Sequence, residues 1–229
     1  MPTASTVLIL GASRGLGLAM AEEWLERGAR VIATQRSAAP ELGSLQRRYP
    51  GSLEVETVDI ADAASVRALR ARLAARRIDI LFVNAGICKA REETPSTVDE
   101  QDFVDMMLTN ALGPMRAVEL LEDLVPANGV IAVMSSELGS IAGNRGSWEL
   151  YSSSKAALNK LMKCFSARHD GDPRALLLIA PGWARTDMGT SAAALSIEES
   201  IPLVVQSVER SGGRACLRFI DRNGRTLPW

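Results

Sequence analysis

Seven short apolar runs alternate with longer segments of helical periodicity along most of the 229-residue chain. The runs are continuous and largely β-branched, which is typical of strands buried on both faces of a parallel sheet. They are Thr6–Leu10, Ala29–Thr34, Leu53–Val58, Ile78–Val83, Val130–Met134, Ala175–Ala180 and Cys216–Ile220. This alternation predicts an α/β fold with a doubly wound parallel sheet and right-handed crossovers.

The segments between these runs place apolar residues at helical spacing. They are Leu16–Arg27, Glu41–Arg48, Ala63–Arg76, Val104–Leu124, Leu150–Arg168 and Ile197–Arg210. No linker or repeat divides the chain, so we expect a single domain over residues 1–229. The region after the sixth run is rich in small residues, and it fits either a small substrate lid around residues 186–200 or a plain surface loop.

The composition argues against several classes of function. Lys plus Arg number 26 and Asp plus Glu number 27, so the net charge of −1 provides no basic surface for nucleic acid or an anionic membrane. Cys88, Cys164 and Cys216 are scattered and the chain has one histidine, so we expect neither a metal site nor a disulfide framework. The first apolar run is too short for a signal peptide. We therefore expect a cytoplasmic protein without metal, nucleic-acid or membrane partners.

A glycine-rich turn, Gly11-Ala12-Ser13-Arg14-Gly15-Leu16-Gly17, follows the first run and begins the first helical segment. Glycines allow a tight turn and close approach of the backbone to a pyrophosphate. The start of the helix adds free N–H groups and a partial positive charge. The position favours a dinucleotide site, although a tight turn without a ligand also fits the pattern.

The end of the second run indicates which dinucleotide binds. An NAD enzyme usually places an Asp or Glu here to hold the ribose 2′-hydroxyl, whereas this chain reads Thr34-Gln35-Arg36. Arg36 and Arg14 could hold a 2′-phosphate through charge-assisted hydrogen bonds. We therefore predict that NADP(H) is preferred and that NAD(H) remains possible; two solvated surface arginines are the alternative.

Tyr151 and Lys155 are spaced for proton transfer. A separation of four residues puts both side chains on one face of the predicted helix. A nearby ammonium favours the phenolate and lowers the pKa of a phenol, which is otherwise near ~10. Such a pair can exchange a proton with a carbonyl or alcohol oxygen while a hydride moves to or from carbon.

Together these motifs resemble the short-chain dehydrogenase/reductase family over nearly the whole chain. The matching positions are the turn Gly11–Gly17, Asp59 and Ile60 after the third run, Asn84-Ala85-Gly86 after the fourth, Asn110, Ser136 after the fifth, Tyr151, Lys155, and Pro181, Gly182, Ala184 and Thr186 after the sixth. The resemblance implies a Rossmann-type domain with strand order 3-2-1-4-5-6-7. It also implies cofactor contacts at Gly11, Ser13, Arg14, Gly15, Leu16, Gly17, Arg36, Asp59, Ile60, Asn84, Ala85, Gly86, Tyr151, Lys155, Pro181, Gly182, Ala184 and Thr186.

The resemblance further implies four catalytic roles. Tyr151 is the proton donor, and Lys155 lowers its pKa and holds the nicotinamide ribose. Ser136 binds the substrate oxygen, and Asn110 anchors a water that links Lys155 to solvent. Consecutive strand residues face opposite sides, so only one of Ser135 and Ser136 can point into the site. The resemblance implies Ser136, because the second serine of this pair usually carries the role in the family. One departure is Leu10, where the family usually has a threonine that ties the glycine turn to its surroundings.

The segment Ser135–Ile141 and the ending Leu227-Pro228-Trp229 are similar to the C-factor and sniffer-type carbonyl reductases. The resemblance therefore implies an NADP(H)-dependent oxidoreductase that acts on a small carbonyl or alcohol substrate. An NADP-binding signalling protein of the C-factor type is a second hypothesis. A sugar-nucleotide epimerase ranks last because the chain is too short for the added substrate domain of those relatives.

Three smaller features remain open in the sequence. Trp148 and Trp183 flank motif positions and fit either an apolar substrate pocket or simple packing. Cys88 follows the Asn-Ala-Gly motif and fits either the site or the core. Family members often pair through the helices at Val104–Leu124 and Leu150–Arg168, so a homodimer is possible.

Overall fold

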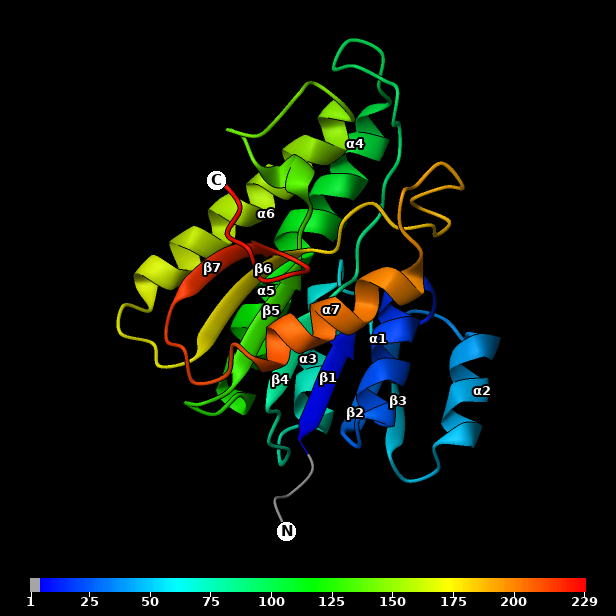
Figure 1. The fold of residues 1–229 in the computed structure, drawn as a ribbon, viewed down its shortest axis with the longest axis vertical. Coiled ribbons are helices and arrows are strands. Elements are labelled where there is room, and N and C mark those ends of the chain that lie inside the picture. Colours follow the sequence, from blue (N-terminus) through cyan, green and yellow to red (C-terminus); the bar gives the residue numbers. More distant parts are fainter. Residues whose placement is uncertain (1–4) are drawn as a thin grey trace.

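The computed structural model describes residues 5–229 and places all seven expected strands in one parallel sheet. The strands are β1 (Thr6–Leu10), β2 (Arg30–Gln35), β3 (Leu53–Thr57), β4 (Ile80–Val83), β5 (Val130–Met134), β6 (Ala175–Ala180) and β7 (Leu217–Asp221). Their order is β3-β2-β1-β4-β5-β6-β7, which confirms the predicted topology. The carboxyl ends of all seven strands therefore meet at one edge of the sheet (Figure 1).

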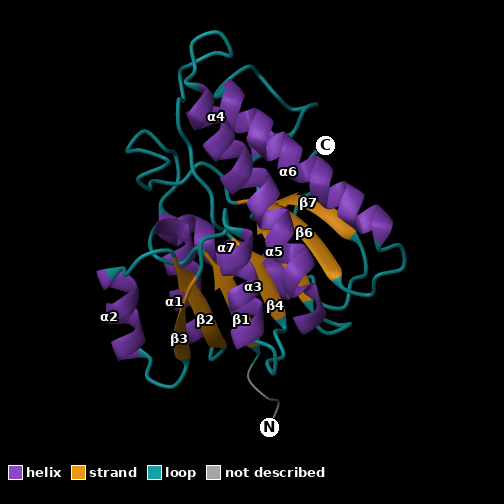
Figure 2. Cartoon of the chain, turned by 180° about the vertical axis from the view of Figure 1, so that it is seen from behind, coloured by secondary structure: helices purple, strands orange, loops and turns teal. Residues whose placement is uncertain are grey.

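Helices cover both faces of the sheet (Figures 1 and 2). One face is covered by α1 (Gly15–Glu26), α2 (Pro40–Arg48) and α7 (Ile197–Glu209). The other is covered by α3 (Ala63–Arg72), α5 (Gly113–Leu121) and α6 (Glu149–Arg168), while α4 (Glu100–Met107) packs against α6. Within β1, Val7 and Ile9 pack into the core beneath α1, α2 and α7. Leu8 and Leu10 pack into the core beneath α3, α5 and α6, because side chains alternate along a strand.

The expected helix over Val104–Leu124 is longer and less regular than its periodicity indicates. It begins at Glu100, because Asp99 accepts a hydrogen bond from the Gln101 N–H and caps a first turn whose residues are mostly polar. A π-helical turn over Leu108–Leu112 joins α4 to α5, where the Gly113 N–H bonds the Leu108 carbonyl. Pro114 follows and has no N–H to continue the α-helical ladder.

The C-terminal tail folds back beside β7. The Leu227 N–H donates to the Phe219 carbonyl, and the Ala142 N–H donates to the Trp229 carbonyl. This second bond ties the end of the chain to the loop that leads from β5 to α6. In the described part of the chain, no helix has the length and apolar character needed to cross a membrane.

Candidate active site

The glycine turn lies between β1 and α1 and leaves no room for side chains. A Cβ on Gly11 would lie 2.8 Å from backbone atoms of Ala85, and one on Gly17 would lie 2.0 Å from the Gly11 carbonyl oxygen. Gly11 also has φ +90°, a conformation that favours glycine. Thr34 Oγ1 accepts from the Gly11 N–H at 3.0 Å, and Asn84 Nδ2 donates to the Gly11 oxygen at 2.7 Å. The turn is therefore tied down although Leu10 replaces the usual threonine.

The N-terminus of α1 is prepared for an anion. Unlike α3 and α4, which are capped by aspartates, α1 has no side-chain cap and no acidic residue in its first turn. The residue at its N-cap is Arg14, which is exposed and forms a 3.0 Å ion pair with Asp187. Arg36 is also exposed, and it lies two residues beyond Thr34, whose hydroxyl binds the turn. Arg14 thus stands at the uncapped helix start, and Arg36 follows the strand whose Thr34 binds the turn.

The residues expected to contact the cofactor after β3 and β4 have mixed environments. Asp59 is half-buried and accepts a hydrogen bond from the Ala61 N–H at 2.9 Å, which leaves its second carboxylate oxygen available. The side chain of Ile60 lies in the core, so any contact it makes with a ligand would involve its backbone. Ala85 follows Asn84 at the end of β4 and packs on the core beneath Gly11.

Tyr151 and Lys155 are both buried on the first two turns of α6, with exposed fractions of 8% and 3%. Lys155 Nζ lies 5.8 Å from the centre of the Tyr151 ring and donates to the Met134 carbonyl at 2.9 Å. Met134 is the last residue of β5, so this bond fixes the ammonium at the carboxyl edge of the sheet. Lys155 is the only charged side chain that is fully buried among residues 5–229.

Burial controls the protonation of this pair. Desolvation raises the pKa of the Tyr151 phenol well above its usual value; nearby Cys88 acts in the same direction, and the Ser136 hydroxyl opposes both. Desolvation lowers the pKa of Lys155 to about 8. The expected lowering of the phenol pKa by Lys155 is therefore not seen, because desolvation of the phenol dominates. The phenol is protonated at neutral pH, which is the form that can donate a proton.

Asn110 lies within the π-helical turn and is completely buried. Its Oδ1 accepts from the Ile87 N–H, and its Nδ2 donates to the Ile87 carbonyl, each at 2.8 Å. Nδ2 also lies 3.0 Å from the Ser154 hydroxyl. A Cβ on Gly86 would lie 3.2 Å from Asn110 Oδ1 and 3.5 Å from Lys155 Nζ, so the backbone of Gly86 passes between these two side chains.

The two serines after β5 have different surroundings, as strand alternation predicts. The Ser135 hydroxyl is buried and donates to Asn159 Oδ1 at 2.7 Å, within the protein. The Ser136 hydroxyl is half-buried, accepts weakly from the Leu138 N–H at 3.2 Å, and lies next to the phenol of Tyr151. Of the two, Ser136 is the one available to a substrate.

The segment after β6 forms a closed loop beside the glycine turn. A short parallel bridge pairs Ala184 with Leu195, and the Thr186 side chain approaches Gly15 and accepts from the Gly189 N–H at 2.9 Å. Pro181 is buried, and Gly182 has φ +79° beside Arg222. The last residues of the predicted lid, from Ile197 onward, belong to α7. That the loop acts as a lid remains a prediction.

Sequence comparison identifies the family. A profile described as short chain dehydrogenase matches residues 5–195, which is most of the chain. The chain belongs to the short-chain dehydrogenase family. This confirms the predicted resemblance and the assignment of the protein as an oxidoreductase.

Solved structures of other family members are similar over the full length. A short-chain dehydrogenase/reductase from Burkholderia multivorans with bound NADP is 51% identical, with 99% of this chain and 100% of that chain covered and a TM-score of 0.97. A carbonyl reductase from Pseudomonas aeruginosa PAO1 in complex with NADP is 39% identical and has a TM-score of 0.91. The match covers 99% of this chain and 100% of that chain. The carbonyl reductase Sniffer of Drosophila melanogaster is 27% identical and has a TM-score of 0.88. The match covers 99% of this chain and 100% of that chain.

Aromatic side chains border the phenol of this family member. The Trp148 ring lies 6.0 Å from that of Tyr151 and 6.3 Å from that of Trp183, both in edge-to-face arrangements. Cys88 packs into the same apolar cluster. Both tryptophans and Cys88 therefore lie at the site. Arg91 joins them, with its guanidinium 4.9 Å from the Trp148 ring, and sequence reasoning missed it because it lies in a loop of an arginine-rich chain.

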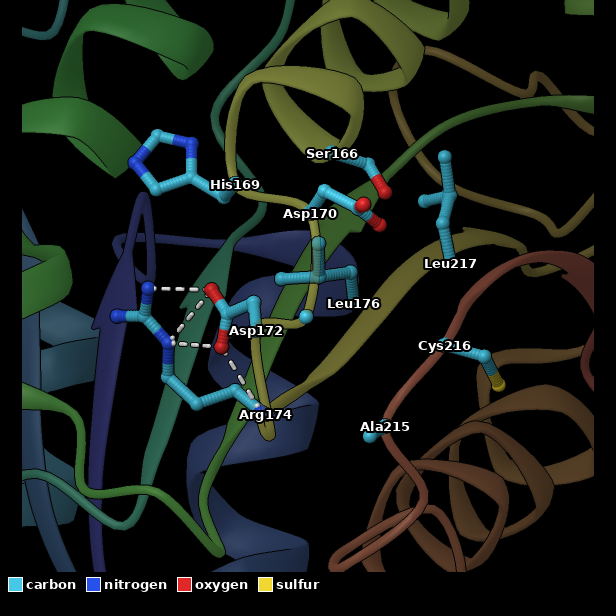
Figure 3. Close-up of a pocket in the computed structure, with 10 residues that line it drawn as sticks. Ser166, His169, Asp170, Asp172, Arg174, Leu176, Ala215, Cys216 and Leu217 are labelled. Atoms are coloured by element: carbon cyan, nitrogen blue, oxygen red, sulfur yellow. Dashed lines mark hydrogen bonds and ion pairs between the residues drawn. The ribbon is translucent and has the colours of Figure 1, made fainter.

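A separate cavity of about 330 Å³ lies where β6 and β7 begin, at the opposite edge of the sheet (Figure 3). Its Arg174 is paired with Asp172 and Glu122, so its charge is already neutralised. His169 lies nearby, 3.2 Å from Glu122. The cavity is remote from Tyr151, and among residues 5–229 no group of three or more metal-ligating side chains was found there or elsewhere.

Proposed function

We propose that this short-chain dehydrogenase is an NADP(H)-dependent carbonyl reductase in which Tyr151 donates the proton. The observation that carries the proposal is the burial of Tyr151 and Lys155 together at the carboxyl edge of the sheet, opposite Ser136. The carbonyl reductases among its structural relatives support the reaction type. The enzyme would reduce a ketone or aldehyde to the alcohol, or oxidise the alcohol to the carbonyl compound.

The residues of the turn fit NADP(H). The uncapped start of α1 presents backbone N–H groups to a pyrophosphate, and Gly11 and Gly17 bring the backbone close. Arg14 and Arg36 would hold the 2′-phosphate, and no acidic residue occupies the end of β2 to select NAD(H). The NADP bound to the Burkholderia relative supports this choice. A titration with both cofactors tests it, and tighter binding of NADH would contradict it.

The bound nicotinamide would supply the hydride that reaches the carbonyl carbon. The chain itself supplies the proton, from Tyr151 Oη to the carbonyl oxygen, and Ser136 donates a hydrogen bond to that same oxygen. The Lys155 ammonium stabilises the phenolate that remains. Asn110 would anchor a water through which Lys155 exchanges protons with solvent. Because burial keeps the phenol protonated, Tyr151 is in the form required to donate a proton during reduction.

Replacing Tyr151 with Phe tests the proton donor. The variant should lose turnover by about 1,000-fold or more, because phenylalanine has no hydroxyl to donate to the carbonyl oxygen, while NADPH binding stays within about threefold of the parent value. Tyr49→Phe is a matched control, because it removes the only other phenolic hydroxyl of the chain, at the end of α2. Retained turnover in the Tyr151 variant would disprove the assignment.

Two further predictions remain open for this family member. Val104, Leu112 and Leu161 are exposed on the helices through which a homodimer would form, with exposed fractions of 44%, 43% and 39%. Sedimentation at several protein concentrations tests whether the chain forms a homodimer.

The cytoplasmic location likewise remains a prediction, which fractionation of cells that produce the protein would test.

A further inference from the structure

Arg91 is a cation held at the substrate side of the site. Its guanidinium lies over the Trp148 ring at 4.9 Å and donates a hydrogen bond to the Met188 carbonyl in the loop after β6. Trp148 in turn contacts the ring of Tyr151. One indole ring therefore separates the guanidinium from the phenol, and two contacts fix its position.

The backbone around Arg91 includes residues in a conformation that is unusual for residues other than glycine. Among residues 5–229, three residues other than glycine have positive φ: Ala90 at 48°, Trp148 at 49° and Thr190 at 64°. Ala90 immediately precedes Arg91, Trp148 carries the ring beneath it, and Thr190 lies in the loop that it contacts. Such conformations cost on the order of 1 kcal/mol each and cluster where function requires a particular geometry. Here all three lie next to Arg91 or on the segments that it contacts.

Among residues 5–229 the charge of Arg91 has no carboxylate partner; its guanidinium lies beside the Cys88 thiol, whose pKa is raised by burial, so this neighbour is neutral. Lys89, two residues earlier, is neutralised by Asp102 and Asp105 at 2.7 Å each, whereas no carboxylate of residues 5–229 lies within 4.0 Å of the Arg91 guanidinium. A half-buried guanidinium without a counter-ion attracts a planar anion, for which its forked N–H groups are suited.

We propose that Arg91 binds a carboxylate of the substrate, so that the preferred substrates are oxo acids rather than neutral ketones. The ketone would lie at Tyr151 and Ser136, and the aliphatic chain of the substrate would cross the Trp148 ring to place its carboxylate at Arg91. This inference rests on the proposed carbonyl reductase function and names its substrate class. Arg91 then sets specificity without taking part in proton transfer.

The test compares straight-chain oxo acids of increasing length with their methyl esters, using NADPH and the full-length protein. At the best spacing, the parent enzyme should have a kcat/KM at least about 10-fold higher for the acid than for its ester. Arg91→Gln should raise KM for the acid by about 10- to 100-fold, the range expected for loss of a hydrogen-bonded charge pair. The ester should change by less than about threefold, and Arg91→Lys should recover part of the acid preference.

Controls separate this inference from the proposed function. Arg67→Gln removes the same charge from the exposed face of α3, and it should leave acid and ester unchanged. Equal losses for acid and ester in Arg91→Gln would assign Arg91 a packing role and overturn the inference. Parent enzyme that reduces esters but shows no acid preference would also overturn it, while leaving the carbonyl reductase function standing. Failure to reduce any member of either series would overturn both.

Discussion

The two halves of the site are built by different means. On the cofactor side, glycines and backbone hydrogen bonds define the shape, and a single added Cβ would collide with main-chain atoms. On the substrate side, side chains from three loops define it, and the strained residues there are not glycines. The first half therefore tolerates almost no change in sequence, whereas the second can change its ligand through single side chains such as Arg91.

The largest expected effect comes from adding one methyl group to the cofactor half. Gly17→Ala places a Cβ 2.0 Å from the Gly11 oxygen and 2.6 Å from Asn84 Nδ2, and the backbone oxygen cannot move without opening the turn. We expect a loss of about 3 kcal/mol in unfolding free energy and loss of NADPH binding. Urea unfolding and a cofactor titration measure the two effects.

Gly43→Ala is the control for that experiment. Gly43 lies within α2, where a Cβ would meet only the end of the Arg47 side chain at 3.8 Å. The substitution should stabilise the protein by about 0.5–1 kcal/mol, since alanine favours a helix. If both alanine variants behave alike, the close backbone contacts around Gly17 do not restrict the cofactor half.

The cofactor half of the site could be predicted from the sequence to a greater extent than the substrate half. The glycine turn and the pair of Tyr151 and Lys155 could be proposed from spacing, and the parallel sheet from the alternation of strands and helices, because these depend on local patterns. The strand order and the choice of Ser136 over Ser135 came from the family resemblance. The π-helical turn at Asn110 was not predicted, because apolar periodicity does not distinguish one such turn from a regular α-helix. Arg91 was not predicted either, because its placement requires two left-handed backbone residues and a ring from a distant segment.

The serine pair after β5 offers a sharper test, since both substitutions remove one hydroxyl. Ser136→Ala should lower kcat by about 100-fold, the loss typical of one hydrogen-bond donor to a reacting oxygen. Ser135→Ala should instead cost about 1–2 kcal/mol of stability, because Asn159 Oδ1 loses its buried donor. Steady-state kinetics and thermal unfolding separate the two outcomes; the reverse result would exchange the roles of the serines.

Lys155 predicts how stability depends on pH. Its pKa is about 8 in the folded protein and near 10.5 in the unfolded chain, so between these values the unfolded chain binds the proton and the folded protein does not. Stability should therefore rise by about 2 kcal/mol from pH 8 to pH 10, relative to Lys155→Met. Urea unfolding at a series of pH values measures this difference. Matching curves for the two proteins would mean that Lys155 remains charged when buried.

The smallest expected effect concerns the contact that joins the two halves. Arg14 of the glycine turn forms a 3.0 Å ion pair with Asp187 of the loop after β6, and both side chains are largely exposed. A 2′-phosphate would compete with Asp187 for the same guanidinium. Asp187→Asn should therefore strengthen NADPH binding by about two- to fivefold, the range of an exposed ion pair, and the gain should shrink at high salt.

NADH distinguishes this competition from a general loosening of the loop. NADH has no 2′-phosphate, so its affinity should be the same in the parent and the Asp187→Asn variant. Arg14→Gln should weaken NADPH binding. It should also abolish the effect of Asp187→Asn, because the guanidinium for which Asp187 and the 2′-phosphate compete is then absent. An equal gain for both cofactors would instead mean that the ion pair restrains the loop after β6. In that case Asp187 would govern access to the substrate half rather than the choice between NADPH and NADH.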